Sequence, residues 1–234
     1  MPLDFSQLKM CTVTFLPLPN NGFILTSNRD ETPLRKTIPP KGYLENGVEV
    51  VYPKDVVAGG TWIGTSEKDR AVCLLNGAYK NHKRTLPYAL SRGVIVKNVL
   101  TADDAEIYIN RLGLRNIEPF TLLLLDYSVD LKLFELVWDG ETKHFHQLDK
   151  TPRIWSSSTL YTDDMKEKRQ EWFQNWLKEN DKFSVANVLE FHNNTDLGEP
   201  EVTTRMKRKL IETVSITSIS KIEEIVDMKY LDFL

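Results

Sequence analysis

Two short runs of apolar and β-branched side chains, CTVTFL (residues 11–16) and GFILTS (residues 22–27), begin the ordered pattern of this chain. Both runs consist largely of residue types that favour β-strands. The segment PNNG (residues 19–22) lies between them and supplies turn chemistry, because Asn and Gly tolerate positive φ. The pattern predicts a β-hairpin. Without a bulge, opposed residues have an even summed number, so Cys11 and Arg29 are predicted to share a face.

Eight further segments read as strands: residues 59–66, 71–76, 119–126, 131–138, 142–148, 153–158, 212–219 and 222–231. Apolar positions three to four residues apart predict helices at residues 86–99, 102–112, 163–179 and 184–193. Core positions are expected at Leu122, Leu124, Phe134, Leu136, Trp172 and Trp176. Residues 32–50 contain three prolines and are predicted to form an irregular loop. The order of strands and helix pairs is typical of two stacked sheets between helical layers.

Composition narrows the class of protein. A chain of 234 residues with 41% hydrophobic content can bury a sizeable core, and no linker or repeat divides it, so one domain is expected. The net charge of −3 argues against a nucleic-acid or membrane-surface binder. No apolar stretch approaches the roughly 20 residues of a membrane span. Two cysteines and the absence of a secretory signal predict a cytoplasmic protein, whose oligomeric state stays open.

The end of the predicted hairpin opposite its turn places several reactive side chains close together. Cys11 is close to Asn28, Arg29, Asp30 and Glu31, which combine a thiol with an amide, a cation and two anions. Arg29 is the better-placed partner, since it could hold a carboxylate or lower the pKa of the thiol. Asp30 points to the other face unless a bulge intervenes. The alternative is a buried cysteine beside a structural Arg–Asp pair.

Three other features carry candidate roles. Asn76 ends a predicted strand, where its amide could face a developing oxyanion or simply form a turn. Gly59 and Gly60 permit positive φ or a close backbone approach, or only begin a strand. The basic run at residues 80–84 could meet an anionic small molecule or be a solvated turn. His144 and His146 share a strand face, but no third ligand lies near them, so no metal site is predicted.

Four motifs in order produce a family resemblance: Met-Cys at Cys11, SNRDE (residues 27–31), AGGTWIG (58–64) and LLNGA (74–78). Together they resemble the NRDE family, which includes transport and Golgi organization protein 2 homologues. The resemblance covers about the first third of the chain by motif. It implies an α+β fold, a four-layer αββα sandwich of the N-terminal-nucleophile (Ntn) hydrolase type, related to bile-salt hydrolases and penicillin V acylases.

The resemblance also implies roles for individual residues. Cys11 would be the nucleophile, with Arg29, Asp30 and Asn76 as its catalytic partners. Substrate-binding roles would fall to Asn28, Glu31, Trp62 and Ser157. The family often has an Asn-bearing triplet where this chain has three serines at residues 156–158. The implied reaction is hydrolysis of a non-peptide amide or acyl bond of a small molecule, without a cofactor.

An Ntn mechanism needs the α-amine of Cys11 as its general base. Residues 1–10 are therefore expected to be a leader or a wrongly assigned start, with residues 11–234 as a single NRDE domain. If Cys11 stays within the chain, the alternative is a carrier that does not catalyse a reaction. The family is implicated in haem trafficking and lipid metabolism, so haem or an acyl-CoA or lipid would be the cargo. Whether the chain is an enzyme thus depends on its N-terminus.

Overall fold

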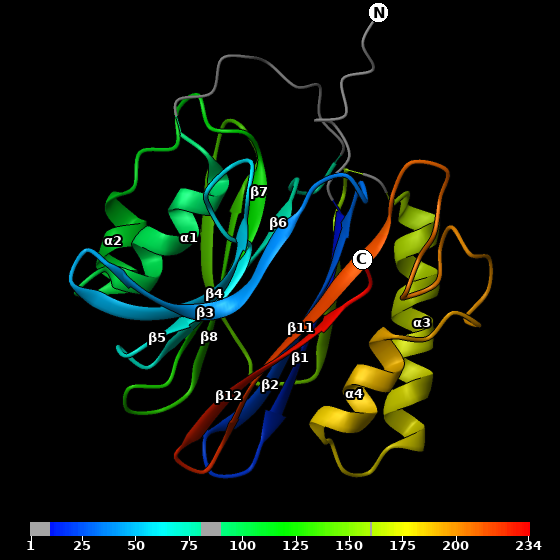
Figure 1. Ribbon diagram of the computed structural model, residues 1–234. Helices are drawn as coiled ribbons and strands as arrows, with labels where there is room; N and C mark the ends of the chain where they lie inside the picture. Colours follow the sequence, from blue (N-terminus) through cyan, green and yellow to red (C-terminus); the bar gives the residue numbers. More distant parts are fainter. Residues whose placement is uncertain (1–9, 81–89, 160) are drawn as a thin grey trace, which may run out of the picture. The chain divides into compact units, whose positions relative to one another are not determined.

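The computed structural model describes residues 10–80, 90–159 and 161–234 (Figure 1). The chain divides into two compact units, one formed by Met1–Leu34 with Thr151–Leu234 and the other by Arg35–Lys150. The basic run beyond residue 80 and the predicted start of the helix at residue 86 lie outside the described residues. The single domain expected over residues 11–234 stays a prediction.

The first unit is a five-stranded antiparallel sheet with two helices. Its strands follow the order β10-β1-β2-β11-β12. The bounds are β1 (Met10–Leu18), β2 (Gly22–Glu31), β10 (Arg153–Ser156), β11 (Glu212–Ile222) and β12 (Ile225–Asp232). The helices are α3 (Asp163–Glu179) and α4 (Val185–His192). The bounds of α3 agree with the predicted helix, whose first turn carries Asp163 and Asp164.

Apolar side chains of α3 and α4 pack on one face of this sheet. The cluster consists of Leu16, Ile24, Phe173, Val188 and Phe191. Trp172 and Trp176 were expected in the core, but both are only partly buried and lie at the margin of this cluster. The buried residues of α3 are Phe173 and Arg169 instead. The helix was therefore predicted correctly, but the apolar residue at the centre of its buried face is Phe173.

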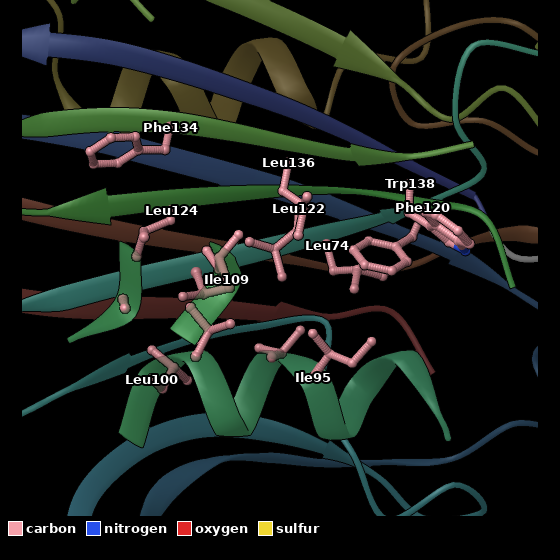
Figure 2. Close-up of a cluster of buried hydrophobic side chains, with 14 of the residues drawn as sticks. Leu74, Ile95, Leu100, Ile109, Phe120, Leu122, Leu124, Phe134, Leu136 and Trp138 are labelled. Carbon is pink, nitrogen blue, oxygen red and sulfur yellow. The ribbon is translucent and has the colours of Figure 1, made fainter. Parts of the chain in front are cut away.

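The second unit is a seven-stranded sheet in which each strand pairs antiparallel with the next along the chain. The strands are β3 (Thr37–Glu45), β4 (Val48–Asp55), β5 (Ile63–Ser66), β6 (Arg70–Asn76), β7 (Phe120–Asp126), β8 (Lys132–Trp138) and β9 (Lys143–Leu148). The helices are α1 (Arg92–Thr101) and α2 (Ala105–Arg111). Figure 2 shows Ile95 and Leu100 of α1 and Ile109 of α2 directed at the sheet. The predicted core positions Leu122, Leu124, Phe134 and Leu136 are buried there.

The irregular loop predicted for residues 32–50 is wrong, because strands β3 and β4 occupy most of it. Proline cannot donate a ladder hydrogen bond, so Pro39 and Pro40 argued against a strand. β3 tolerates them because it is an edge strand of its sheet. The pairing with β4 also shifts register between Ile38 and Lys41, which spans both prolines. An edge position and a bulge are both settings in which a strand accepts proline.

The paired glycines before β5 have distinct conformational roles. Gly59 has a φ of +67°, which glycine adopts without strain. A Cβ at Gly60 would lie 2.9 Å from the Cα of Gly93, so the β4–β5 loop and the start of α1 meet backbone to backbone. The close approach that the sequence allowed for these glycines is therefore present.

Candidate active site

The β1–β2 hairpin sets the position of Cys11. Asn20 and Asn21 both have positive φ, near 55° and 58°, which is the conformation of a type I′ turn. The turn closes with a 3.0 Å hydrogen bond from the amide of Gly22 to the carbonyl of Pro19. Pro19 is one residue extra beside the turn, because the closing bond joins it to Gly22 while the ladder pairs Leu18 with Gly22. From that pair onward the register is constant, so Cys11 opposes Arg29 and Met10 opposes Asp30. The predicted parity of the hairpin is confirmed.

Asp30 lies on the opposite face of β2 from Arg29, since successive strand residues alternate. Its carboxylate accepts a 2.6 Å hydrogen bond from the hydroxyl of Thr213 and a 3.1 Å hydrogen bond from that of Tyr161. The Thr213 hydroxyl itself accepts the amide hydrogen of Met206, which leaves its own hydrogen for Asp30. Burial raises the pKa of Asp30 to about 6, against the lowering effect of Arg169 and both hydroxyls.

A bulge does occur at this level of the sheet, but it lies in β11. Thr213 pairs with Asp30 and Ser215 pairs with Arg29, so Val214 is the extra residue. The bulge brings the Thr213 hydroxyl to Asp30 without moving Asp30 from its own register in the β1–β2 hairpin. The sequence pattern predicted a bulge only as a condition for turning Asp30, and it gave no signal for one in β11.

Arg169 of α3 is a buried cation close to this carboxylate. Its Nε donates to the carbonyl of Val202 at 2.7 Å and its Nη2 to the carbonyl of Thr203 at 2.6 Å. Its Nη1 donates to the hydroxyl of Thr12, the residue that follows Cys11. The guanidinium also lies over the ring of Tyr161, 3.7 Å from the centroid. Arg169 was not singled out from the sequence; a cation among the apolar positions of this helix was the available signal.

Asn28 takes part in a second buried network. Its amide nitrogen donates to the carbonyls of His192 at 3.0 Å and Thr204 at 2.7 Å. Its amide oxygen is 2.6 Å from Nδ1 of His192, which therefore carries the ring hydrogen. Nε2 then accepts from the hydroxyl of Thr14 at 2.7 Å. Burial, with the charge of Arg169, lowers the pKa of His192 to about 3. These contacts hold α4 against β1 and β2, and sequence analysis did not single out His192.

Glu31 and Ser157 also belong to the first unit. Glu31 is buried and accepts the amide hydrogen of Thr32 at 3.0 Å. Ser157 is buried, and its hydroxyl lies 2.9 Å from that of Thr159. Because Ser156 pairs with Thr12, Ser157 leaves β10 at the level of Cys11. Cys11 therefore has Arg29 on the neighbouring strand at one side and the serine run at the other.

Asn76 and Trp62 belong to the second unit. Asn76 is the last residue of β6, pairs with Phe120 and is buried. Trp62 lies just before β5 and is also buried. The structure thus groups Cys11, Asn28, Arg29, Asp30, Glu31 and Ser157 in one unit and places Asn76 and Trp62 in the other.

Two hydroxyls on the Cys11 face of the sheet were not singled out from the sequence. Ser215 opposes Arg29, and Thr217 opposes Ser27. Both side-chain oxygens are buried, and neither has a hydrogen-bond partner among the residues that the structure describes. A buried hydroxyl without a partner costs free energy, so these two are candidates for contact with a bound molecule.

Among residues 10–80, 90–159 and 161–234, no three His, Cys, Asp or Glu side chains are grouped to hold a metal ion. His144 instead pairs with Asp139 at 2.9 Å. Within the same ranges, no helix has the length and apolar character needed to cross a membrane.

Solved structures with a similar fold are N-terminal-nucleophile hydrolases. The Caenorhabditis elegans orthologue of N-acylethanolamine-hydrolyzing acid amidase matches with a TM-score of 0.62 and 15% identity, over 89% of this chain and 92% of that one. Two variants of conjugated bile acid hydrolase from Clostridium perfringens match with TM-scores of 0.55 and 0.54 and identities of 11% and 10%. Each covers 95% of this chain and 92% of its own. The α+β fold class of the Ntn-hydrolase type is confirmed.

The family follows from the sequence match. The model of the family described as Transport and Golgi organisation 2 matches residues 10–228. The chain therefore belongs to this family, as its NRDE motifs indicated. No curated protein sequence matches it.

Proposed function

We propose that this chain is a cysteine hydrolase of the N-terminal-nucleophile type, acting on a non-peptide amide or related acyl bond of a small molecule. The observation that carries the proposal is the register of the β1–β2 hairpin, with Arg29 opposite Cys11 and Asp30 opposite Met10. In a chain that begins at Cys11, the α-amine takes the end of β1, next to Asp30. A thiol, an amine, a carboxylate and a guanidinium then meet at one strand end.

The chemistry requires few groups. The α-amine of Cys11 takes the thiol proton as the sulfur attacks the carbonyl carbon of the substrate, which gives a tetrahedral oxyanion. Collapse of that intermediate passes the proton to the leaving amine and leaves a thioester on Cys11. Water, deprotonated by the same α-amine, then attacks the thioester and releases the carboxylic acid. Thiol and amine are restored. An unperturbed α-amine has a pKa near ~8, which suits a general base close to neutral pH.

In this proposal Arg29 and Asp30 have separate roles. Arg29 opposes Cys11 in the β1–β2 pairing and would hold a substrate carboxylate or lower the pKa of the thiol. Asp30 would orient the α-amine. Asn76, at the end of β6, and Ser157 would donate to the oxyanion, while Trp62 and Glu31 would contact the substrate. Asn28 has a different environment, because its amide already binds His192 and Thr204.

The bond to be cleaved is proposed from likeness to the two kinds of structural neighbour. One is named for hydrolysing N-acylethanolamines and the other for hydrolysing conjugated bile acids. Both names describe a small substrate. The guanidinium of Arg29, which is buried opposite Cys11 in the β1–β2 pairing, supports the further proposal that the substrate carries an anionic group. A cytoplasmic location stays part of the same proposal.

The test combines the intact mass of the purified protein with turnover of a panel of N-acyl amides. We expect a chain that begins at Cys11 and hydrolyses one class of amide. The variant Cys11→Ala should lose turnover, whereas Cys73→Ala, a thiol buried in β6, should retain it. Arg29→Lys keeps the charge but not the planar fork, so it should raise KM. Asp30→Asn should lower kcat more than it raises KM.

Two results would overturn the proposal. The first is full activity in a chain that retains Met10, because its Cys11 has no α-amine. The second is turnover by Cys11→Ala equal to that of the parent. Tight binding of haem or an acyl-CoA without hydrolysis of any amide would establish the carrier function instead.

A further inference from the structure

Arg169 is buried, and no carboxylate of the residues that the structure describes accepts a hydrogen bond from it. The three groups that accept from its guanidinium are the carbonyls of Val202 and Thr203 and the hydroxyl of Thr12. Its side chain is fully buried. A buried cation is costly unless hydrogen bonds and a nearby anion offset its desolvation. Such a residue in the middle of an apolar helix face therefore calls for an explanation.

The contacts of Arg169 lead to Asp30 through Tyr161. The guanidinium stacks on one face of the Tyr161 ring, 3.7 Å from its centroid, and the hydroxyl of that ring donates to Asp30. Burial raises the pKa of Tyr161, so its hydroxyl stays protonated and keeps donating. Arg208 also approaches the ring, 5.6 Å from the centroid. The charged and titratable groups that act on the Asp30 carboxylate are thus Arg169, Tyr161 and Arg208.

A second contact leads from Arg169 to the nucleophile strand. Thr12 follows Cys11 directly, and its hydroxyl accepts from Nη1 of the guanidinium. On the other side of Cys11, residue 10 opposes Asp30 in the β1–β2 pairing. One side chain therefore reaches both the strand position after Cys11 and, through Tyr161, the carboxylate at the position before it.

We propose that Arg169 and Tyr161 are positioning residues of the Cys11 centre: Arg169 fixes β1 through Thr12, and the Arg169–Tyr161 stack holds the Asp30 carboxylate where the α-amine of Cys11 would lie. The inference rests on the proposed hydrolase function and goes beyond it, because neither residue touches the substrate. Arg169 also supplies the charge that keeps Asp30 ionised. Its loss should raise the pKa of Asp30 further, since the cation lowers that pKa in the intact protein.

The test uses Arg169→Met, which removes the cation and the fork, and Tyr161→Phe, which removes only the hydroxyl. Lys168→Met is the matched control, because Lys168 is an exposed cation on the same helix. The first readout is the titration of the Asp30 carboxyl by NMR in protein with 13C-labelled aspartate, assigned with Asp30→Asn. We expect Arg169→Met and Tyr161→Phe to raise the pKa of Asp30, and Lys168→Met to leave it unchanged.

The second readout is the pH profile of hydrolysis. A higher pKa of Asp30 moves the acid limb of kcat/KM to higher pH, so the ratio of kcat/KM at pH 5 to that at pH 8 should fall about threefold or more. The loss should appear in kcat rather than KM. Arg169→Lys should recover part of the ratio, because it restores the charge without the fork. A residue that served only to stabilise the fold would not move these quantities.

The outcomes separate this inference from the function on which it rests. An unchanged Asp30 titration in both Arg169→Met and Tyr161→Phe overturns the inference, whatever the parent hydrolyses. If both variants raise the pKa of Asp30 but the parent hydrolyses no amide, the positioning of Asp30 is supported and the hydrolase proposal is overturned. If Arg169→Met does not fold, the titration of Asp30 in Tyr161→Phe tests the inference by itself, because this variant keeps the ring and its stacking on Arg169.

Discussion

The stability of the first unit should fall at acidic pH because of His192. This side chain is fully buried as a neutral imidazole, with Nδ1 bonded to Asn28 and Nε2 to Thr14. Its pKa is about 3 in the folded protein, against an ordinary value of 6.5. Because the folded-state pKa is depressed, the unfolded chain binds the proton first. The stability linked to His192 is therefore complete above pH 6.5 and is lost as the pH falls toward 3.

The magnitude follows from the same two values. At pH 4.5, two pH units below the ordinary value of 6.5, one protonation difference costs about 3 kcal/mol of unfolding free energy. Asp30 acts in the opposite direction. Its pKa is raised from 3.8 to about 6, so the folded state binds its proton first and gains stability as the pH falls through 6. In the parent protein the two groups therefore offset each other in part.

The experiment compares urea unfolding of the parent and His192→Gln at pH 7 and pH 4.5. Glutamine does not titrate, so the variant should lose about 3 kcal/mol less than the parent on acidification. At pH 7 the free energy of unfolding of the variant should be lower by roughly 1–3 kcal/mol, because the buried contacts with Asn28 and Thr14 are disrupted. His146→Gln, an exposed histidine on β9, is the control and should follow the parent. If the parent and His192→Gln lose the same unfolding free energy between pH 7 and pH 4.5, His192 is not a buried neutral imidazole.

Three further outcomes are expected. Phe173→Ala should cost on the order of 3–5 kcal/mol in urea unfolding, since its ring is at the centre of the cluster under α3 and α4. Gly60→Ala should lower the thermal midpoint, because its Cβ would lie 2.9 Å from the backbone of α1, whereas Gly42→Ala meets no atom within 4 Å. Asn28→Asp places a carboxylate beside the ring nitrogen of His192 and should raise that pKa in a 15N NMR titration.

Local patterns in the sequence determined the hairpin and the main helix. Asn20 and Asn21 tolerate the positive φ that a tight hairpin turn requires, so they locate the turn between the two apolar runs. The register of Cys11 also depends on Pro19: counting from the closing pair Pro19–Gly22 would place Asp30 opposite Cys11, and the one extra residue beside the turn places Arg29 there instead. The bounds of α3 follow from the spacing of its apolar residues and from acidic residues in its first turn. These features depend on residues close in the chain, so a single sequence is enough to predict them.

Long-range contacts decided what the sequence could not. β3 accepts Pro39 and Pro40 because it is an edge strand, and edge status depends on which strands of the sheet pair with which. Likewise, the partners of Asp30 come from Tyr161 and Thr213, more than a hundred residues away in the chain. No local pattern predicts such a meeting.

The same reason explains the buried polar residues that the sequence did not single out. A cation in an apolar helical stripe and a histidine at a helix end have many possible environments. Only the packing of α3 and α4 on β1 and β2 buries Arg169 against Thr12 and His192 against Asn28. The sequence determined which side chains occupy β1 and its neighbour β2. Tertiary structure decided which distant groups hold them, because burial and charge pairing arise only when separate segments meet.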